Sequence, residues 1–361
     1  MRLTHLKASN FRNFSQVELN PTPGVNIFFG LNGSGKTNLL EAVFLLCLGR
    51  SQRGVGDNVL LQSGQETYRV EGKLESRGKV QEVSVACSNR GRKQIMIDGI
   101  KSRLPELYDN FSAVAIGPED SELLSGPPSA RRLFLDLYIS QFSKMYLEQL
   151  SRYNRILAQK NAALKDGMEF ESYNALLAKS GAEIMKARRQ FLEDVLELSE
   201  NYYKKFSGSS SFDIRYQPSA LDSGWPDEKL VESAFEKRLY EVSEKEKIVK
   251  MSLIGPHRDE IEMSINALPA RTHGSQGEWR SAAIAIKLAA FELLKVKKKF
   301  APLLLLDEVF AELDEKRSAA LIDSFEDFEQ IFLTTAAEPP ELLSRNGKKF
   351  QIQNGRIILE S

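Results

Sequence analysis

Apolar residues along the chain follow two different spacings, which predict a layered α/β core whose two halves are separated by a helical insertion. Residues 25–29 form an apolar run of the length of a buried strand, and residues 36–48 carry apolar side chains at helical spacing, with Gly49 placed to end the helix. Residues 303–306 and 330–335 again have the pattern of buried strands. The end of the chain is therefore expected to complete the core that its beginning opens.

In the middle of the chain the spacing of the apolar residues changes twice. Residues 67–98 alternate apolar and polar positions between turn residues, which predicts an antiparallel β meander. Residues 129–165 and 172–205 carry apolar stripes of helical spacing, joined near Asp166-Gly167, which predicts a helical arm. We therefore predict three regions. Residues 1–110 form the N-terminal half of a layered α/β head, residues 111–250 form a helical second lobe with a short antiparallel arm, and residues 251–361 form the C-terminal half of the head.

Charge and composition narrow the class of protein only slightly. Lysine plus arginine and aspartate plus glutamate both number 49, so any contact with nucleic acid has to come from local basic patches. No apolar run is long enough to cross a bilayer and the first residues lead into no signal-like segment, which predicts a cytoplasmic protein without membrane contact. Cys47 and Cys87 lie in a helix pattern and a strand pattern, where reduced core cysteines are expected.

The strongest chemical signal is a glycine-rich turn between the first buried strand and the helix that follows it. It matches the phosphate-loop pattern and consists of Gly30, Leu31, Asn32, Gly33, Ser34, Gly35, Lys36 and Thr37. Glycines let backbone N–H groups converge on phosphate oxygens, and the helix N-terminus adds a favourable dipole. Lys36 is expected to reach the β- and γ-phosphates of ATP, and the Thr37 hydroxyl to bind Mg²⁺. An ordinary glycine loop is the alternative.

An acidic pair follows the apolar strand at residues 303–306. At the carboxyl edge of a sheet, Asp307 is the expected Mg²⁺ ligand, and Glu308 is the expected catalytic base for the water that attacks the γ-phosphate. Taken alone, the pair is equally well explained by a strand that ends in a solvated acidic turn. Together with the phosphate loop, it predicts ATP hydrolysis.

The two motifs lie far apart along the chain, as in ABC-type ATPases of the SMC class, whereas a kinase or small GTPase usually keeps them close. That class carries a serine–glycine signature before the acidic strand, and Ser275, Gln276 and Gly277 stand at that place. In such proteins the signature caps the γ-phosphate bound by the other protomer, so two copies close over ATP, and N–H groups at a helix start can serve as donors. For this segment alone, a serine that only caps the next helix is the alternative.

Two further features follow the acidic strand. Asp314 stands where the class has its dimer-contacting loop and is the candidate for signalling between two ATP sites, with an ordinary helix-start acid as an equal alternative. No histidine follows Asp307, so the switch histidine of transporter ATPases is missing, and Thr334 and Thr335 occupy its place. This argues against a transporter subunit.

Several other segments resemble signatures of the RecF family, in the family's order along nearly the whole chain. They are residues 10–14, 117–120, 127–128, 131–132, 134–136 and 255–259. The resemblance implies an ABC-type head with a helical second lobe, a weak DNA-stimulated ATPase that forms a homodimer on ATP, and contacts of Arg12 and Asn13 with the phosphates or ribose. It also implies binding at junctions of single- and double-stranded DNA in the nucleoid, where such proteins work with RecR and RecO to load RecA at gaps and support repair, replication restart and the SOS response.

Two positions depart from the family pattern. Trp279 places a large aromatic side chain beside the signature, and no glutamine near residues 115–117 is placed to sense the metal ion. For DNA, the candidate contacts are the basic residues Arg50, Arg53, Arg90, Arg92, Lys93, Arg131, Arg132, Lys186, Arg188 and Arg189. Most such clusters are simply solvated faces.

Two other functions share part of this evidence. An SMC-like or nuclease-associated head would be expected to show a long coiled-coil arm or an added metal-dependent domain, and the sequence shows neither. A metabolic kinase would need a second substrate pocket and would not dimerise on ATP. Oligomeric state therefore separates a kinase from the main hypothesis.

Overall fold

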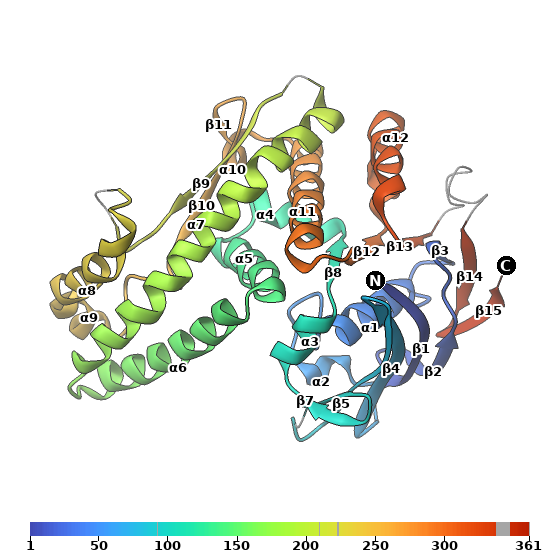
Figure 1. Cartoon of the computed structure of the whole chain (residues 1–361), viewed down its shortest axis with the longest axis horizontal. Helices are drawn as coiled ribbons and strands as arrows, with labels where there is room; N and C mark the ends of the chain where they lie inside the picture. The colour runs from blue at the N-terminus through green and yellow to red at the C-terminus, as the bar shows by residue number, and fades with distance from the viewer. Residues whose placement is uncertain (92, 209, 222–223, 337–346, 361) are drawn as a thin grey trace. The chain divides into compact units, whose positions relative to one another are not determined.

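The computed structural model describes residues 1–91, 93–208, 210–221, 224–336 and 347–360, and it divides the chain into two compact units (Figure 1). The first, here called the head unit, comprises Met1–Asp120, Lys205–Gly208 and Lys287–Ser361. The second unit comprises Ser121–Lys204 and Ser209–Ile286.

The unit boundaries differ from the predicted ones at both ends of the helical region. Residues 111–120 belong to the head unit because β8 (Ala113–Ile116) pairs in parallel with β12 (Leu303–Asp307). Residues 251–286 belong to the second unit because β10 (Glu260–Ile265) pairs along its whole length with β9 (Phe212–Gln217). The signature segment at residues 275–277 is therefore part of the second unit. Short strands whose partners are distant in sequence leave too weak a pattern to place this boundary.

A six-stranded sheet in the order β15-β14-β3-β13-β12-β8 forms one layer of the head unit. Besides β8 and β12, its strands are β3 (Gly24–Phe29), β13 (Gln330–Thr335), β14 (Lys348–Gln353) and β15 (Arg356–Glu360). All neighbouring strands are parallel except β14 and β15. Because the carboxyl ends of parallel strands meet at one edge, the ends of β3, β12 and β13 come together there.

Helix α1 (Lys36–Leu48) follows β3 through the phosphate loop and is buried along nearly its whole length. It is apolar on all sides because it contacts β12 and β13 of the parallel sheet and also β4 and β5 of a second sheet. Gly49 ends it in the left-handed conformation, with φ of 63°, as the sequence predicts. Cys47 on this helix and Cys87 are both free and buried, as expected.

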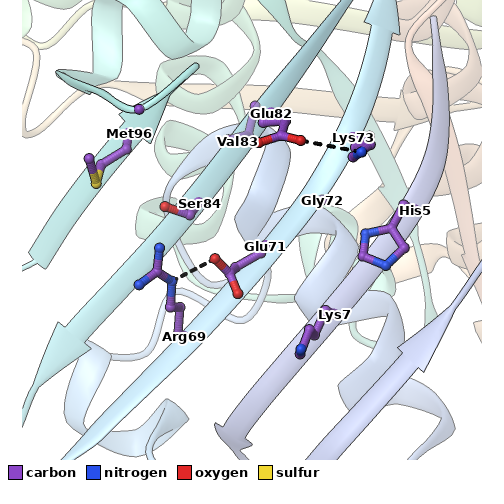
Figure 2. A pocket seen from close by; sticks show the side chains of 11 residues that line it. His5, Lys7, Arg69, Glu71, Gly72, Lys73, Glu82, Val83, Ser84 and Met96 are labelled. Atoms are coloured by element: carbon purple, nitrogen blue, oxygen red, sulfur yellow. Dashed lines mark ion pairs between the residues drawn. The ribbon is translucent and has the colours of Figure 1, made fainter.

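The second sheet of the head unit is antiparallel, in the order β2-β1-β4-β5-β6-β7, and contains the predicted meander. Its strands are β1 (Arg2–Phe11), β2 (Phe14–Leu19), β4 (Thr67–Ser76), β5 (Lys79–Ser88), β6 (Lys93–Ile97) and β7 (Ile100–Ser102). One face packs on α1, and Figure 2 shows the other face at a hollow of about 270 Å³. Opposite charges pair there, with Arg69 2.8 Å from Glu71 and Lys73 3.3 Å from Glu82. This face is therefore a solvated surface of balanced charge.

Three helices dominate the second unit, namely α5 (Pro128–Phe142), α6 (Lys144–Asp166) and α7 (Ser172–Ser207), whose last residues are assigned to the head unit. The predicted helical stretch at residues 129–165 is thus two helices. Ser143 separates them in an extended conformation, and its hydroxyl accepts the N–H of Tyr146 to cap α6. Gly167 ends α6 with φ of 70°, at the joint that the sequence indicates.

The second unit also contains a sheet that the sequence analysis did not predict, in the order β11-β10-β9, with β11 at Leu268–Pro269. The remaining α-helices of the described chain are α2 (Asp57–Leu60), α3 (Leu104–Asn110), α4 (Glu122–Ser125), α8 (Val231–Glu241), α9 (Ser243–Val249), α10 (Ala270–His273), α11 (Gln276–Lys298) and α12 (Glu315–Asp323). Within the described ranges, no helix carries an apolar stretch long enough to cross a membrane.

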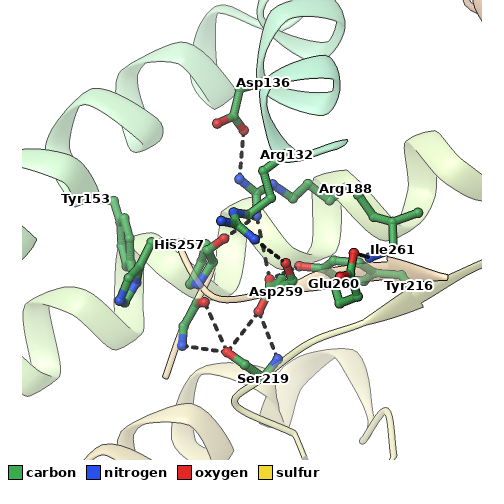
Figure 3. A network of polar contacts seen from close by, with 12 residues as sticks. Arg132, Asp136, Tyr153, Arg188, Tyr216, Ser219, His257, Asp259, Glu260 and Ile261 are labelled. Atoms are coloured by element: carbon green, nitrogen blue, oxygen red, sulfur yellow. Dashed lines mark hydrogen bonds and ion pairs between the residues drawn. The ribbon is translucent and has the colours of Figure 1, made fainter. Parts of the chain in front are cut away.

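A buried polar network joins the helices of the second unit to the turn at residues 255–259 (Figure 3). Arg188 on α7 is 2% exposed, and its guanidinium donates to Asp136 on α5 at 2.8 Å and to the carbonyl of Pro256 at 2.6 Å. Asp259 is fully buried and accepts hydrogen bonds from the backbone and side chain of Ser219 and from the Tyr216 hydroxyl. The network gives the 255–259 segment a structural role.

Candidate nucleotide-binding site

The phosphate loop of the head unit occupies the turn between β3 and α1. Its glycines Gly30, Gly33 and Gly35 have φ values of 150°, 79° and 115°, which residues that carry a Cβ rarely adopt. Leu31 and Asn32 are exposed at the tip of the loop. The glycines are therefore required by the backbone path, and an alanine at any of them would be strained.

Lys36 opens α1, and its side chain turns back over the loop. Its Nζ donates to the carbonyl oxygens of Gly30 at 2.9 Å and Leu31 at 3.2 Å, and lies 3.3 Å from Glu308 Oε1. The Lys36 side chain is 3% exposed. The ammonium group is thus held at the base of the loop, with Glu308 as its anionic partner.

Asp307 lies at the centre of the site, where β12 ends. Its Oδ1 accepts a hydrogen bond from the Thr37 hydroxyl at 2.8 Å and another from the Thr334 hydroxyl at 2.6 Å. The pKa of Asp307 is raised, mainly by burial and further by the negative charge of Glu308, although these two hydrogen bonds and the positive charge of Arg53 act in the opposite direction. A buried carboxylate whose charge is opposed by burial is stabilised by a cation.

The oxygen atoms at this centre suit magnesium. Mg²⁺ takes oxygen ligands and keeps several waters, so one carboxylate and one hydroxyl from the protein are enough. Asp307 and Thr37 provide these two groups within one hydrogen bond of each other. The described part of the chain holds no group of three or more His, Cys, Asp or Glu side chains that could form a larger metal site.

Glu308 follows Asp307 in a left-handed conformation, with φ of 50°, which is uncommon for a residue other than glycine. Its N–H donates to the Thr334 hydroxyl at 2.9 Å, and that hydroxyl in turn donates to Asp307. Thr334 therefore holds both acids. The sequence indicated only that Thr334 stands where a switch group would act, because its register beside Asp307 comes from the pairing of β12 with β13.

Arg12 and Asn13 lie beside the loop but make protein contacts. The Arg12 guanidinium donates to both carboxylate oxygens of the buried Glu41 on α1, at 2.7 and 3.0 Å. The Asn13 amide donates to the carbonyl of Ser34 at 3.0 Å. Asn13 therefore supports the loop from outside, whereas Arg12 contacts α1. Contact of either residue with phosphate or ribose stays a prediction.

The signature residues lie in the second unit, at the start of α11. Ser275 forms a capping box with Glu278, because the Ser275 hydroxyl accepts the Glu278 N–H at 3.3 Å and the Glu278 carboxylate accepts the Ser275 N–H at 2.8 Å. Ser275 and Gln276 are exposed, and Gly277 is half-buried. Trp279, the departure from the family pattern, donates its indole N–H to Ala270 at 2.7 Å. The aromatic ring is thereby tied to α10.

Asp314 is the helix-start acid that the alternative reading describes. Its carboxylate accepts the N–H of Arg317 at 2.8 Å at the start of α12, and its side chain is 59% exposed. The exposure leaves it available to a second molecule.

Residues 115–117, which contain no glutamine, end at Gly117, and a Cβ built on Gly117 would lie 3.3 Å from the Asp307 Cβ. Asp120 accepts the Gly117 N–H at 2.8 Å, and Lys287 Nζ lies 2.5 Å from Asp120 Oδ1 and 2.6 Å from the carbonyl of Ala115. The sequence analysis singled out the segment at residues 117–120 but gave Asp120 no role, and it did not identify Lys287.

Several of the candidate DNA contacts are paired with other groups of the protein. Arg131 is 4% exposed and paired with Glu260 at 2.7 Å, and Arg132 donates to the carbonyl of Asp259 at 2.8 Å. Arg188 is the centre of the buried network, and Lys93 is paired with Asp57 at 2.7 Å. Arg53 and Arg90 remain exposed, and Arg92 lies outside the described residues. A cluster of basic residues in a sequence does not show which of them are buried in ion pairs and which are exposed on the surface.

The phosphate loop, the acidic end of β12 and the sheet order define an ABC-type P-loop ATPase head of the SMC class. A family model described as RecF/RecN/SMC N terminal domain matches residues 2–341. The chain is 33% identical over 369 residues to the DNA replication and repair protein RecF of Staphylococcus carnosus, covering 99% of this chain and 100% of that protein. The chain belongs to the RecF family.

Solved structures agree with this assignment. A structure described as the recombination mediator protein RecF with ATP in the RecFOR pathway is 30% identical, with a TM-score of 0.91 over 99% of this chain and 97% of that chain. An Smc head domain from Pyrococcus furiosus, 16% identical with a TM-score of 0.55 over 98% of this chain and 94% of that chain, shares the fold.

Proposed function

We propose that this chain is an ATP-switched recombination mediator that acts on DNA. The observation that carries the proposal is the environment of Asp307 Oδ1, which accepts hydrogen bonds from both the Thr37 and the Thr334 hydroxyls. The ion pair of Lys36 and Glu308 belongs to the same site. This arrangement suits a nucleoside triphosphate with its metal ion. The solved RecF structure with ATP, which matches nearly the whole chain, supports ATP as the nucleotide.

Each residue of the site has a defined part in ATP hydrolysis. Backbone N–H groups of residues 30–37 hold the phosphates, and Lys36 exchanges its contact with Glu308 for the β- and γ-phosphates. Thr37 and Asp307 would hold Mg²⁺, and a bound ion would supply positive charge to neutralise the charge that develops on the phosphates. Glu308, released from Lys36, then aligns or deprotonates the attacking water.

Two copies of the chain close over ATP in this proposal. Ser275, Gln276 and Gly277 of one copy cap the γ-phosphate bound by the other, since the start of α11 is exposed and offers N–H groups. The Ser275 hydroxyl, which now donates to Glu278 at 2.8 Å, would donate to the phosphate instead. Asp314 of each copy signals across the interface. ATP binding would therefore drive dimerisation, and weak, DNA-stimulated hydrolysis would reverse it.

The biological role follows from the family. We infer that the dimer binds gaps and junctions of single- and double-stranded DNA in the cytoplasm, at the nucleoid, and works with RecO and RecR to load RecA during repair, replication restart and SOS induction. The description of the solved relative as a recombination mediator in the RecFOR pathway supports this inference. Binding to DNA phosphates should weaken steeply as salt rises.

The first experiment is the solution mass of the protein with and without ATP and Mg²⁺. Glu308→Gln slows hydrolysis, so this variant should be dimeric with ATP. Ser275→Asp in the same background retains a good helix cap but repels the phosphate, and Ser275→Arg blocks the site sterically, so both should stay monomeric. A Glu308→Gln protein that binds ATP yet stays monomeric with and without DNA would overturn the dimer mechanism.

A further inference from the structure

The C-terminal hairpin of the chain reaches the phosphate loop from outside. β14 runs parallel to β3 and pairs with it up to Gln351 and Phe29 (Figure 1). β14 then continues for two residues beyond the paired segment, and the turn Asn354–Gly355 leads into β15. β3 leads directly into the phosphate loop. The two residues by which β14 extends beyond its pairing with β3 therefore place the Asn354–Gly355 turn beside that loop.

Backbone groups of the hairpin and the loop approach closely. A Cβ built on Gly30 would lie 2.2 Å from the carbonyl oxygen of Ile352, and one built on Gly355 would lie 2.6 Å from the carbonyl oxygen of Asn13. The Gly355 N–H donates to the carbonyl of Ser34 at 3.1 Å. Gly355 is therefore held between two segments that sequence reasoning placed at the nucleotide.

The Ser34 carbonyl accepts two hydrogen bonds from outside the loop. One comes from the Gly355 N–H and the other from the Asn13 side-chain amide, which itself accepts a hydrogen bond from Asn38 at 2.8 Å. A planar trans peptide points its C=O and its N–H in opposite directions. With the Ser34 C=O held toward Asn13 and Gly355, the Gly35 N–H points away from both, toward the other side of the loop.

We propose that the Asn354–Gly355 turn and the Asn13 amide are positioning groups that aim the Gly35 N–H at the phosphates of the bound nucleotide. The proposal rests on the proposed function, because it concerns the same ATP site. In this proposal Asn13 acts on the nucleotide indirectly, by orienting the phosphate loop. The C-terminal hairpin becomes part of the nucleotide site, although it lies outside every motif that the sequence analysis assigned to that site.

A matched pair of glycines tests the proposal. Gly355 and Gly99 follow Asn354 and Asp98 in similar hairpin turns, with φ of 69° and 77°, but a Cβ on Gly99 would meet no atom within 4 Å. Alanine at either position strains the turn equally, whereas only Gly355→Ala presses on the Asn13 backbone. Gly355→Ala should weaken ATP and ADP binding about tenfold to a hundredfold relative to Gly99→Ala, as expected for a misdirected hydrogen bond to a charged group.

A second variant avoids any question of folding at the turn. Asn13→Leu keeps the approximate size of the side chain and adds no charge near the phosphates, but it removes the donor to Ser34, so it should also weaken ATP and ADP binding about tenfold. Calorimetric titration of the full chain measures the affinities. Equal affinities of Gly355→Ala and Gly99→Ala, or of Asn13→Leu and the wild type, overturn the proposal. A wild-type chain that binds neither nucleotide would instead overturn the proposed function.

Discussion

Lys36 Nζ and Glu308 Oε1 lie 3.3 Å apart, so the cation that should bind phosphate and the carboxylate that should activate water face each other in this structure. The negative charge of Glu308 compensates the positive charge of the buried Lys36 ammonium until a phosphate of the nucleotide replaces the carboxylate. It also makes Glu308 a competitor of the nucleotide for Lys36.

This competition predicts two opposite effects of Glu308→Gln. ATP hydrolysis should fall at least about a hundredfold because the base is lost. ATP affinity should rise, by up to roughly fivefold, because Lys36 loses an anionic partner that is about one-third exposed. Titration with ATP and a phosphate-release assay measure both. The exposed Glu119, changed to Gln, is the control, and an unchanged ATP affinity in Glu308→Gln would show that the pair does not compete.

Thr334 bridges the two acids, so its hydroxyl should matter for both metal binding and turnover. Thr334→Val removes the hydrogen bond to Asp307 and leaves the Glu308 N–H without its acceptor. We expect hydrolysis about tenfold slower, a higher Mg²⁺ requirement, and a loss of about 1–3 kcal/mol in the free energy of unfolding. Thr334→Ser, which keeps the hydroxyl, should behave like the wild type. Equal impairment of both variants would show that the methyl group, and not the hydroxyl, is needed.

Arg188 should contribute to stability rather than to DNA binding. Arg188→Met removes the guanidinium that lies beside Asp136 and the fully buried Asp259, and we expect a loss of about 3–5 kcal/mol in the free energy of unfolding. Arg189→Met is the matched control, because Arg189 is only half-buried. It pairs with Glu193 at 2.8 Å and lies over the Trp225 ring at 4.8 Å, contacts that together are worth about 0–2 kcal/mol. Urea unfolding measures both. A stable Arg188→Met protein whose DNA affinity depends less on salt would restore the DNA assignment.

His257 should make stability depend on pH. Burial lowers its pKa from 6.5 to about 4, and the positive charges of Arg258, Arg132 and Lys160 act in the same direction. Between these values the unfolded chain binds a proton that the folded chain does not, so stability is highest above pH 6.5 and falls as pH drops toward 4.

The slope from this one group is about 1.4 kcal/mol per pH unit. His257→Gln should remove that part of the slope, as measured by urea unfolding at several pH values. His273→Gln is the control because the His273 side chain is exposed. If both variants keep the wild-type slope, His257 is not the group that titrates.

Local patterns in the sequence sufficed for the parts of the site that lie within one strand–turn–helix unit. The glycine spacing, the strand before it and the helix after it indicate a phosphate loop, and the run ending in Asp307 and Glu308 indicates the edge of a sheet. These elements are long or strongly periodic, so their hydrophobic spacing alone predicts them. The long helices α6 and α7 are predictable for the same reason, and glycine marks the helix ends at Gly49 and Gly167.

Tertiary structure alone decided which distant residues meet. The pairing of β12 with β13 brings Thr334 to Asp307, and β14 carries Gly355 to Ser34, through hydrogen bonds between strands that no local period records. Burial likewise decided that Arg131 and Arg188 serve the second unit, since a basic residue in sequence carries no sign of the carboxylate it will find. The sequence by itself determined the chemistry available to this protein, and the strand order determined which groups act together, because register and burial depend on the whole chain.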